Sequence, residues 1–140
     1  MMHFAILRWL YPFLSGVVLG GLAMILHECG HLATAFLIGV RVKQVGLKWN
    51  KGLFTVREPG TVPQNLAISV AGPTVNLLLI ATEPWFPIFS LANFCYALAN
   101  MLPIEGSDGF RVAACWRRIR ESRVANRAGV IATDSAIGKT

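Results

Sequence analysis

Residues 16–40 have the sequence GVVLGGLAMILHECGHLATAFLIGV, and this stretch decides the fold of the chain. It is longer than the roughly 20 apolar residues that an α-helix needs to cross a bilayer. Its apolar run is interrupted only by His27, Glu28 and His31, which fall within one helical turn. The stretch therefore predicts a transmembrane helix that carries a group of polar side chains inside it.

The three polar residues form the pattern HExxH. Because residues i and i+4 lie on one face of a helix, His27 and His31 can reach a single ion, with Glu28 beside it. Zinc accepts imidazole nitrogen and keeps a fourth position open for water. Each ionisable residue in a membrane helix costs a few kcal/mol, so a cluster of three indicates a site. The alternative is a buried polar cluster that only joins helices. We predict one Zn²⁺ ion, bound by both histidines.

The composition supports a lipid environment. Hydrophobic residues make up 54% of the 140-residue chain and charged residues only 14%, whereas a soluble domain carries about 25% charged residues. The net charge is +6, but no Lys or Arg occurs between residues 58 and 110. Basic residues crowd the flanks instead, which is typical of a membrane protein with apolar spans and basic loops. We therefore expect a lipid bilayer as partner and no nucleic acid.

Two further apolar stretches, 66–80 and 86–102, follow the first. Both are short for a full crossing, and they are expected to pair as a tight helical hairpin. Between the first two spans, residues 41–57 are rich in strand formers and contain a turn sequence at 50–52. This loop predicts a short β-hairpin at the membrane surface. The segment 4–14 is interpreted as an extension of the first helix or as an interfacial segment.

The predicted fold class is mostly α and integral to the membrane. It has a three-helix transmembrane core with spans 16–40, 66–80 and 86–102, the β-hairpin between the first two spans, and a basic amphipathic C-terminal helix that rests on anionic lipid. Residues 1–123 are expected to form one membrane-embedded domain, and residues 124–140 a polar, disordered tail.

The basic residues also predict an orientation. Five lie in the loop 41–57 and seven follow Asp108. By the positive-inside rule both segments are expected to be cytoplasmic, and two spans between them return the chain to the same side. The expected protein is a multi-pass membrane protein with its N-terminus outside.

Two histidines leave a catalytic zinc ion short of one protein ligand. Glu105 and Asp108 follow the third apolar stretch at its cytoplasmic end, near the level expected for His31. Position alone leaves both carboxylates open as the third ligand.

A resemblance to a known family favours one of these two carboxylates as the third ligand. Residues 100–109, NMLPIEGSDG, resemble the N-x-x-P-x-x-x-x-D-G signature of the site-2 protease family of intramembrane metalloproteases, and residues 71–76, AGPTVN, resemble its middle-helix motif. The resemblance implies that Asp108 is the third zinc ligand and that Asn76 helps to hold the substrate or the reacting carbonyl. Asp108 could instead cap the C-terminal helix, and Asn76 could join two helices. Residues 105–107 depart from the usual pattern, which keeps Glu105 as an alternative ligand.

The resemblance also implies a function, a zinc-dependent endopeptidase that cuts membrane-anchored proteins within or beside the bilayer. Glu28 would take a proton from a zinc-bound water, and Asn76 would stabilise the oxyanion. The substrate helix would have to unwind, and strand edges within residues 41–57 could hold it extended. Two alternatives are a non-catalytic membrane scaffold or chaperone and a metal-ion carrier. Residues 77–81 contain no polar side chain, which argues against the carrier.

Overall fold

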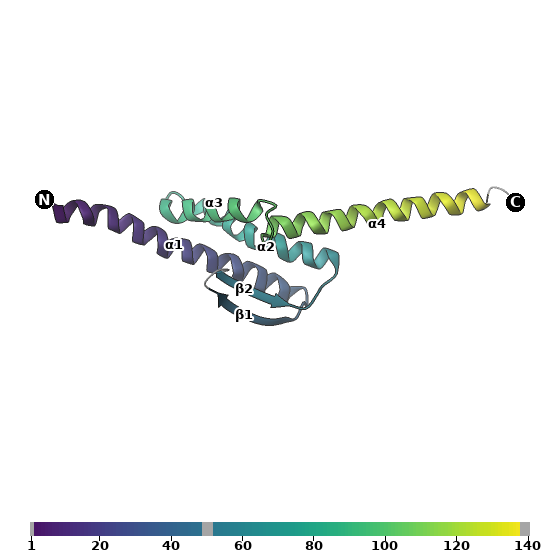
Figure 1. Ribbon diagram of the computed structural model, residues 1–140, viewed down its shortest axis with the longest axis horizontal. Coiled ribbons are helices and arrows are strands. Elements are labelled where there is room, and N and C mark those ends of the chain that lie inside the picture. Colours follow the sequence, from purple (N-terminus) through teal and green to yellow (C-terminus); the bar gives the residue numbers. More distant parts are fainter. Residues whose placement is uncertain (1, 49–51, 138–140) are drawn as a thin grey trace.

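The computed structural model describes residues 2–48 and 52–137. Its elements in chain order are α1 (Met2–Leu37), β1 (Val42–Lys48), β2 (Gly52–Arg57), α2 (Val62–Leu79), the 3₁₀ turn η1 (Ile80–Thr82), α3 (Pro87–Met101) and α4 (Asp108–Ile137). The molecule is elongated, with the N-terminal half of α1 and the C-terminal half of α4 projecting in opposite directions from the core (Figure 1).

Helix α1 is continuous from Met2, so the segment before the predicted first span is an extension of that helix. The helix ends at a glycine: Gly39 has a φ of +74°, a left-handed conformation that residues with a Cβ rarely adopt. The backbone N–H of Val40 then donates to the carbonyl of Ala35 at 2.8 Å. This sharp end sends the chain directly into β1.

Helix α2 begins with a complete cap. The Thr61 hydroxyl accepts from the backbone N–H of Gln64, and the Gln64 side chain accepts in return from the backbone N–H of Thr61. Pro63 lies in the first turn, where a missing N–H costs nothing. Helices α1, α2 and α3 all contact one another. A Cβ at Gly30 would lie only 2.8 Å from Val75, so this glycine allows α1 and α2 to approach closely.

The interior of the helical core is polar and its outer surface is apolar. The largest fully buried side chains in the described part of the chain are His27, Asn76, Asn93 and Ser69. Large apolar side chains are exposed along all three helices, among them Val17, Ile25, Phe36, Leu78, Leu91 and Leu98. This is the reverse of a water-soluble protein and suits helices that face lipid.

In the part of the chain that the structure describes, two helical segments are long and apolar enough to cross a membrane, Leu10–Leu37 and Val62–Thr82. Helix α3 has 15 residues, which is too few for an unassisted crossing of a bilayer about 30 Å thick. The mostly helical fold class is confirmed. Of the three predicted spans, two meet the length and composition that spanning requires.

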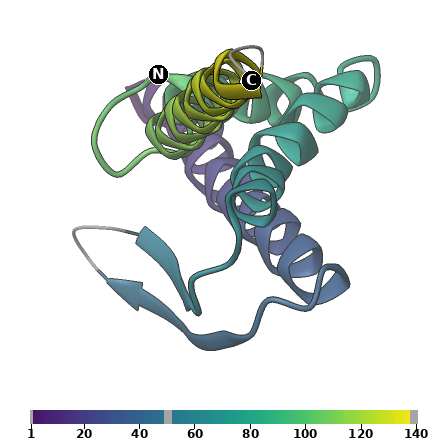
Figure 2. The ribbon, with the colours of Figure 1, turned by 90° about the vertical axis from the view of Figure 1, so that its right-hand side faces the viewer.

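The predicted β-hairpin is confirmed as a two-stranded antiparallel sheet in which Leu47 pairs with Leu53 and Val45 with Thr55. Most of the turn predicted at 50–52 falls outside the described residues. The sheet lies to one side of the helices (Figure 2), where β2 contacts α1.

The expectation of a disordered tail from residue 124 is wrong for residues 124–137. Helix α4 continues through them to Ile137. The segment contains four alanines and no proline, and alanine has the highest helix propensity. Residues 138–140 lie outside the described part. The helix leads away from the core along the long axis of the molecule (Figure 1). Contact between α4 and lipid stays a prediction.

Candidate metal centre

Three side chains predicted from the sequence meet at one point inside the helical core. The Nε2 atoms of His27 and His31 lie 3.0 Å apart, and Oδ2 of Asp108 lies 2.9 Å from the first and 3.0 Å from the second. All three residues are buried. Two atoms that share one tetrahedral zinc ion at about 2.0–2.1 Å lie about 3.3 Å apart, so the observed spacing is close to what a common ion requires.

Hydrogen bonds orient both imidazole rings. Nδ1 of His27 donates to Oδ1 of Asn76 at 2.5 Å, and Nδ1 of His31 donates to the carbonyl of Ile68 at 2.6 Å. Because these oxygens only accept, Nδ1 carries the proton in each ring and the Nε2 lone pairs face each other and Asp108. Three electron-rich atoms at this spacing repel one another unless a cation lies between them. The donor set therefore fits a zinc ion.

Asn76 is held by a second layer of hydrogen bonds. Its Nδ2 donates to the carbonyl of Ala23 at 3.1 Å and to Oδ1 of Asn93 at 2.7 Å. Asn93 in turn donates to the carbonyl of Phe89 at 2.8 Å. Both asparagines have an exposed fraction of 0%. The two N–H bonds of the Asn76 amide are thus used within the helical core, and its oxygen faces His27.

A glycine provides the space beside the histidines. A Cβ built at Gly72 of α2 would lie 2.7 Å from Nε2 of His27 and closer still to Nε2 of His31. Only a residue without a side chain lets the α2 backbone pass so near these two nitrogens. The pattern at residues 71–76 therefore contributes an open space at Gly72 as well as the amide of Asn76.

The chain after α3 places Asp108. Gly106 has a φ of +93°, and the hydroxyl of Ser107 then accepts from the backbone N–H of Phe110 at 3.1 Å. Ser107 is therefore the N-cap of α4, which leaves the carboxylate of Asp108 to face the histidines.

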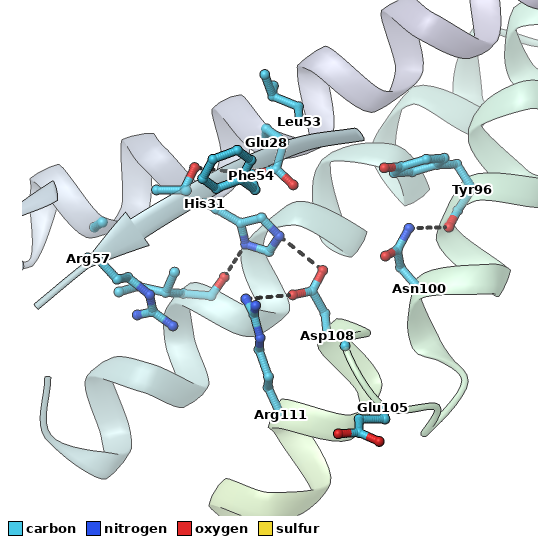
Figure 3. Close-up of a pocket in the computed structure, with 14 residues that line it drawn as sticks. Glu28, His31, Leu53, Phe54, Arg57, Tyr96, Asn100, Glu105, Asp108 and Arg111 are labelled. Carbon is cyan, nitrogen blue, oxygen red and sulfur yellow. Dashed lines mark hydrogen bonds and ion pairs between the residues drawn. The ribbon is translucent and has the colours of Figure 1, made fainter. Parts of the chain in front are cut away.

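The alternative ligand, Glu105, does not join the cluster. Its side chain is exposed, and Figure 3 shows it beyond Asp108 as seen from His31. The only potential metal-binding group within the described residues consists of His27, His31 and Asp108.

A cavity of about 580 Å³ opens onto the cluster. It is lined from α1 by Glu28, His31 and Ala35, from β2 by Leu53, Phe54, Thr55 and Arg57, and from the remaining segments by Ile68, Tyr96, Asn100, Glu105, Gly106, Asp108 and Arg111. The hydroxyl of Thr55 donates to Oε2 of Glu28 at 3.3 Å. The ring of Tyr96 meets His27 edge-on, with centroids 5.0 Å apart. Figure 3 shows the Tyr96 hydroxyl directed into this space.

Sequence reasoning missed Thr55, Tyr96, Arg57 and Arg111 as residues of the cavity. One signal was present for Tyr96, which lies one helical turn before Asn100 and so shares a face of α3 with that motif residue. Arg57 and Arg111 contributed only to the prediction of how the chain is oriented in the membrane. No pattern within residues 41–57 pointed to Thr55.

The chain resembles known proteins over most of its length. A family model described as Peptidase M50B-like matches residues 1–102. The protein named "Putative zinc metalloprotease sll0528" from Synechocystis sp. is 27% identical over a match that covers 74% of this chain and 31% of that protein. Stage IV sporulation protein FB of Bacillus subtilis is 30% identical, with 63% of this chain and 35% of that protein covered. The chain thus spans about a third of the length of these relatives. Because the family model covers more than half of the chain, the chain belongs to the Peptidase M50B-like family, that of the site-2 proteases.

Proposed function

We propose that this chain is the catalytic core of a zinc-dependent endopeptidase that hydrolyses peptide bonds of membrane-anchored proteins within or beside the bilayer. The observation that carries the proposal is the buried convergence of His27 Nε2, His31 Nε2 and Asp108 Oδ2 at the wall of a cavity that also holds Glu28. Family membership supports a metalloprotease, and the name of the Synechocystis relative supports zinc.

His27, His31 and Asp108 would hold the ion. Zinc bound there would lower the pKa of a water molecule and polarise the scissile carbonyl. Glu28 neighbours this point in sequence and lines the same cavity, so it is placed to accept the proton of the attacking water and to pass it to the leaving amine. The hydrogen bond from Thr55 favours one orientation of the Glu28 carboxylate.

Asn76 enters the proposal as a positioning residue. Its two N–H bonds are given to Ala23 and Asn93, so in this structure it has no donor left for an oxyanion. Its oxygen instead accepts from Nδ1 of His27, which keeps Nε2 free to bind the metal. This geometry favours the helix-joining alternative for Asn76, with the added role of orienting a ligand. The hydroxyl of Tyr96 is a neutral donor on the cavity wall that can take the oxyanion role.

The substrate is proposed to bind in extended form. A peptide bond inside a membrane helix is protected by the hydrogen bonds of that helix, so hydrolysis requires local unwinding. Strand β2 supplies Leu53, Phe54 and Thr55 to the cavity wall, and within the described residues the two-stranded sheet leaves one edge of each strand without a partner strand. An unwound substrate segment can add to the β2 edge, which would align it along the cavity.

We further propose a multi-pass arrangement with α1, α2 and the shorter α3 embedded in the bilayer, and with the hairpin and α4 in the cytoplasm. The distribution of basic residues supports this orientation. His27 and His31 lie in the C-terminal half of the apolar segment Leu10–Leu37. In the proposed orientation the metal centre would therefore lie nearer to the cytoplasmic face. Water would then enter from that side.

The decisive experiment compares Glu28→Gln with Asp108→Ala in the purified chain, with a membrane-anchored reporter protein as substrate. Glu28→Gln should retain zinc and lose cleavage, because the ligands remain while the proton acceptor is gone. Asp108→Ala should lose both. Cleavage by Glu28→Gln at the wild-type rate would refute the proposal and favour the non-catalytic scaffold or chaperone.

A further inference from the structure

A second, smaller cavity lies beside the first and differs from it in charge. Its volume is about 200 Å³, several times the roughly 30 Å³ that one water molecule occupies in the liquid. Three arginines line it, Arg57 from the end of β2 and Arg111 and Arg118 from α4. Asn65 and Ser69 of α2 supply neutral polar groups, and no acidic side chain is among its lining residues.

Two of its polar groups are buried without a hydrogen-bond partner. Within residues 2–48 and 52–137, the buried side-chain atoms that lack a partner are Nη1 of Arg57 and Oγ of Ser69, and both belong to this cavity. Ser69 has an exposed fraction of 1%. Leaving a buried donor unpaired destabilises the folded chain, and more so when the donor is charged. Two such atoms in one cavity indicate that the cavity receives an acceptor.

The arginines also repel one another. Burial, and next the positive charge of Arg111, lower the pKa of Arg57 below its usual value. Arg111 has an acidic neighbour, since its Nη1 lies 3.7 Å from Oδ1 of Asp108, but the described residues include no ion pair for Arg57 or Arg118. An anion between these guanidinium groups would remove the repulsion and accept the unpaired donors together.

We propose that this second cavity binds a phosphate oxyanion, either a free phosphate group or the headgroup phosphate of an anionic phospholipid. Arginine side chains form paired hydrogen bonds with phosphate oxygens, and a serine hydroxyl and an asparagine amide supply neutral donors of the kind found around phosphate. The ligand would tie the end of β2 to α2 and α4. It would also lie next to the metal centre, because Arg57 and Arg111 line both cavities. Figure 3 shows these two arginines at the first cavity.

The test uses the purified full chain in a neutral detergent with a chelator present, so that its outcome does not depend on zinc or on proteolysis. Two probes are titrated at about 0.15 M salt, which screens surface charge to about 8 Å. One probe is inorganic phosphate, followed by calorimetry. The other is phosphatidylglycerol compared with phosphatidylcholine in nanodiscs, followed by native mass spectrometry of the retained lipid.

The decisive variants are Arg118→Gln and its matched control Arg117→Gln, which removes the same charge from the adjacent exposed position outside the cavity. Arg118→Gln should weaken binding about tenfold or more, as expected for loss of a charge-assisted hydrogen bond, and Arg117→Gln should leave it unchanged. Binding of inorganic phosphate with this pattern identifies a free phosphate site. The same pattern with phosphatidylglycerol alone identifies a headgroup site.

Equal weakening by both variants would overturn the proposal, because it would show a general attraction to the basic helix α4. Failure of both probes to bind would overturn it as well. If Arg118→Gln does not fold, Ser69→Ala decides the question. A several-fold loss of affinity in that variant supports the site, and unchanged affinity refutes it.

Discussion

The hydrogen-bond network behind His27 makes a sharp prediction for Asn76→Ala. This substitution leaves two buried groups without a partner, namely Nδ1 of His27 and Oδ1 of Asn93, whereas the carbonyl of Ala23 keeps its hydrogen bond within helix α1. At about 1–3 kcal/mol each, the summed cost is about 2–6 kcal/mol as an upper bound, a large part of the about 5–15 kcal/mol that stabilises a typical domain. We therefore expect a marked loss of thermal stability.

Zinc affinity should fall at the same time. Loss of a residue that orients a metal ligand costs about 10–100-fold in affinity, which is about 1.4–2.7 kcal/mol at 1.36 kcal/mol per tenfold. The measurement is competition for zinc with a fluorescent chelator at low temperature, with the folded fraction followed by circular dichroism. Asn76→Asp keeps an acceptor for His27 and should recover much of the zinc affinity that Asn76→Ala loses.

A matched control is available on the same helix. The exposed hydroxyl of Thr74 donates only to the carbonyl of Val70 one turn earlier, so Thr74→Ala should change neither stability nor zinc binding appreciably. The competing role for Asn76, donation to an oxyanion, predicts the opposite pattern. Normal zinc affinity in folded Asn76→Ala, with a much reduced kcat, would refute the positioning argument.

Three further predictions concern the metal centre. Gly72→Ala should abolish zinc binding, because the added Cβ would overlap Nε2 of His31, whereas Gly20→Ala meets no atom within 4 Å and should bind zinc normally. Thr55→Val should slow cleavage of a reporter substrate without changing zinc affinity, since Thr55 contacts Glu28 and no ligand; weaker zinc binding would contradict this. Zinc at 100 times its Kd should stabilise the folded wild-type chain by about 2.7 kcal/mol, and a chelator should reverse the rise in Tm; an unchanged Tm would argue against a metal site in the folded state.

Much of the secondary structure could be predicted because its signals are local. Apolar length predicts helices near 16–40, 66–80 and 86–102, and alternating strand formers predict the hairpin. The boundaries shifted where local chemistry decides them: Gly39 ends α1, and the cap at Thr61 starts α2 four residues before the predicted span. The helix beyond residue 124 was not predicted, although the alanines of this segment have high helix propensity.

The candidate site also contains residues that could be predicted from the sequence and residues that could not. His27 and His31 could be paired from the sequence because four residues on a helix fix their relative position. Choosing Asp108 over Glu105 needed the turn after α3, where a positive φ at Gly106 and the cap at Ser107 decide which carboxylate faces inward. The partners of Asn76 could not be predicted, because they lie on helices other than α2: His27 and Ala23 on α1, and Asn93 on α3.

By itself, the sequence determined that this chain places two imidazoles and a carboxylate within one turn of an apolar helix, and that its flanking loops are basic. Those properties depend on helical spacing and on composition, which act over a few residues. Only the tertiary structure decided which distant carboxylate completes the cluster, that Asn76 directs its oxygen at His27, and that three arginines surround a second cavity. Such choices depend on contacts between segments tens of residues apart, and only the packing of the helices brings those segments together.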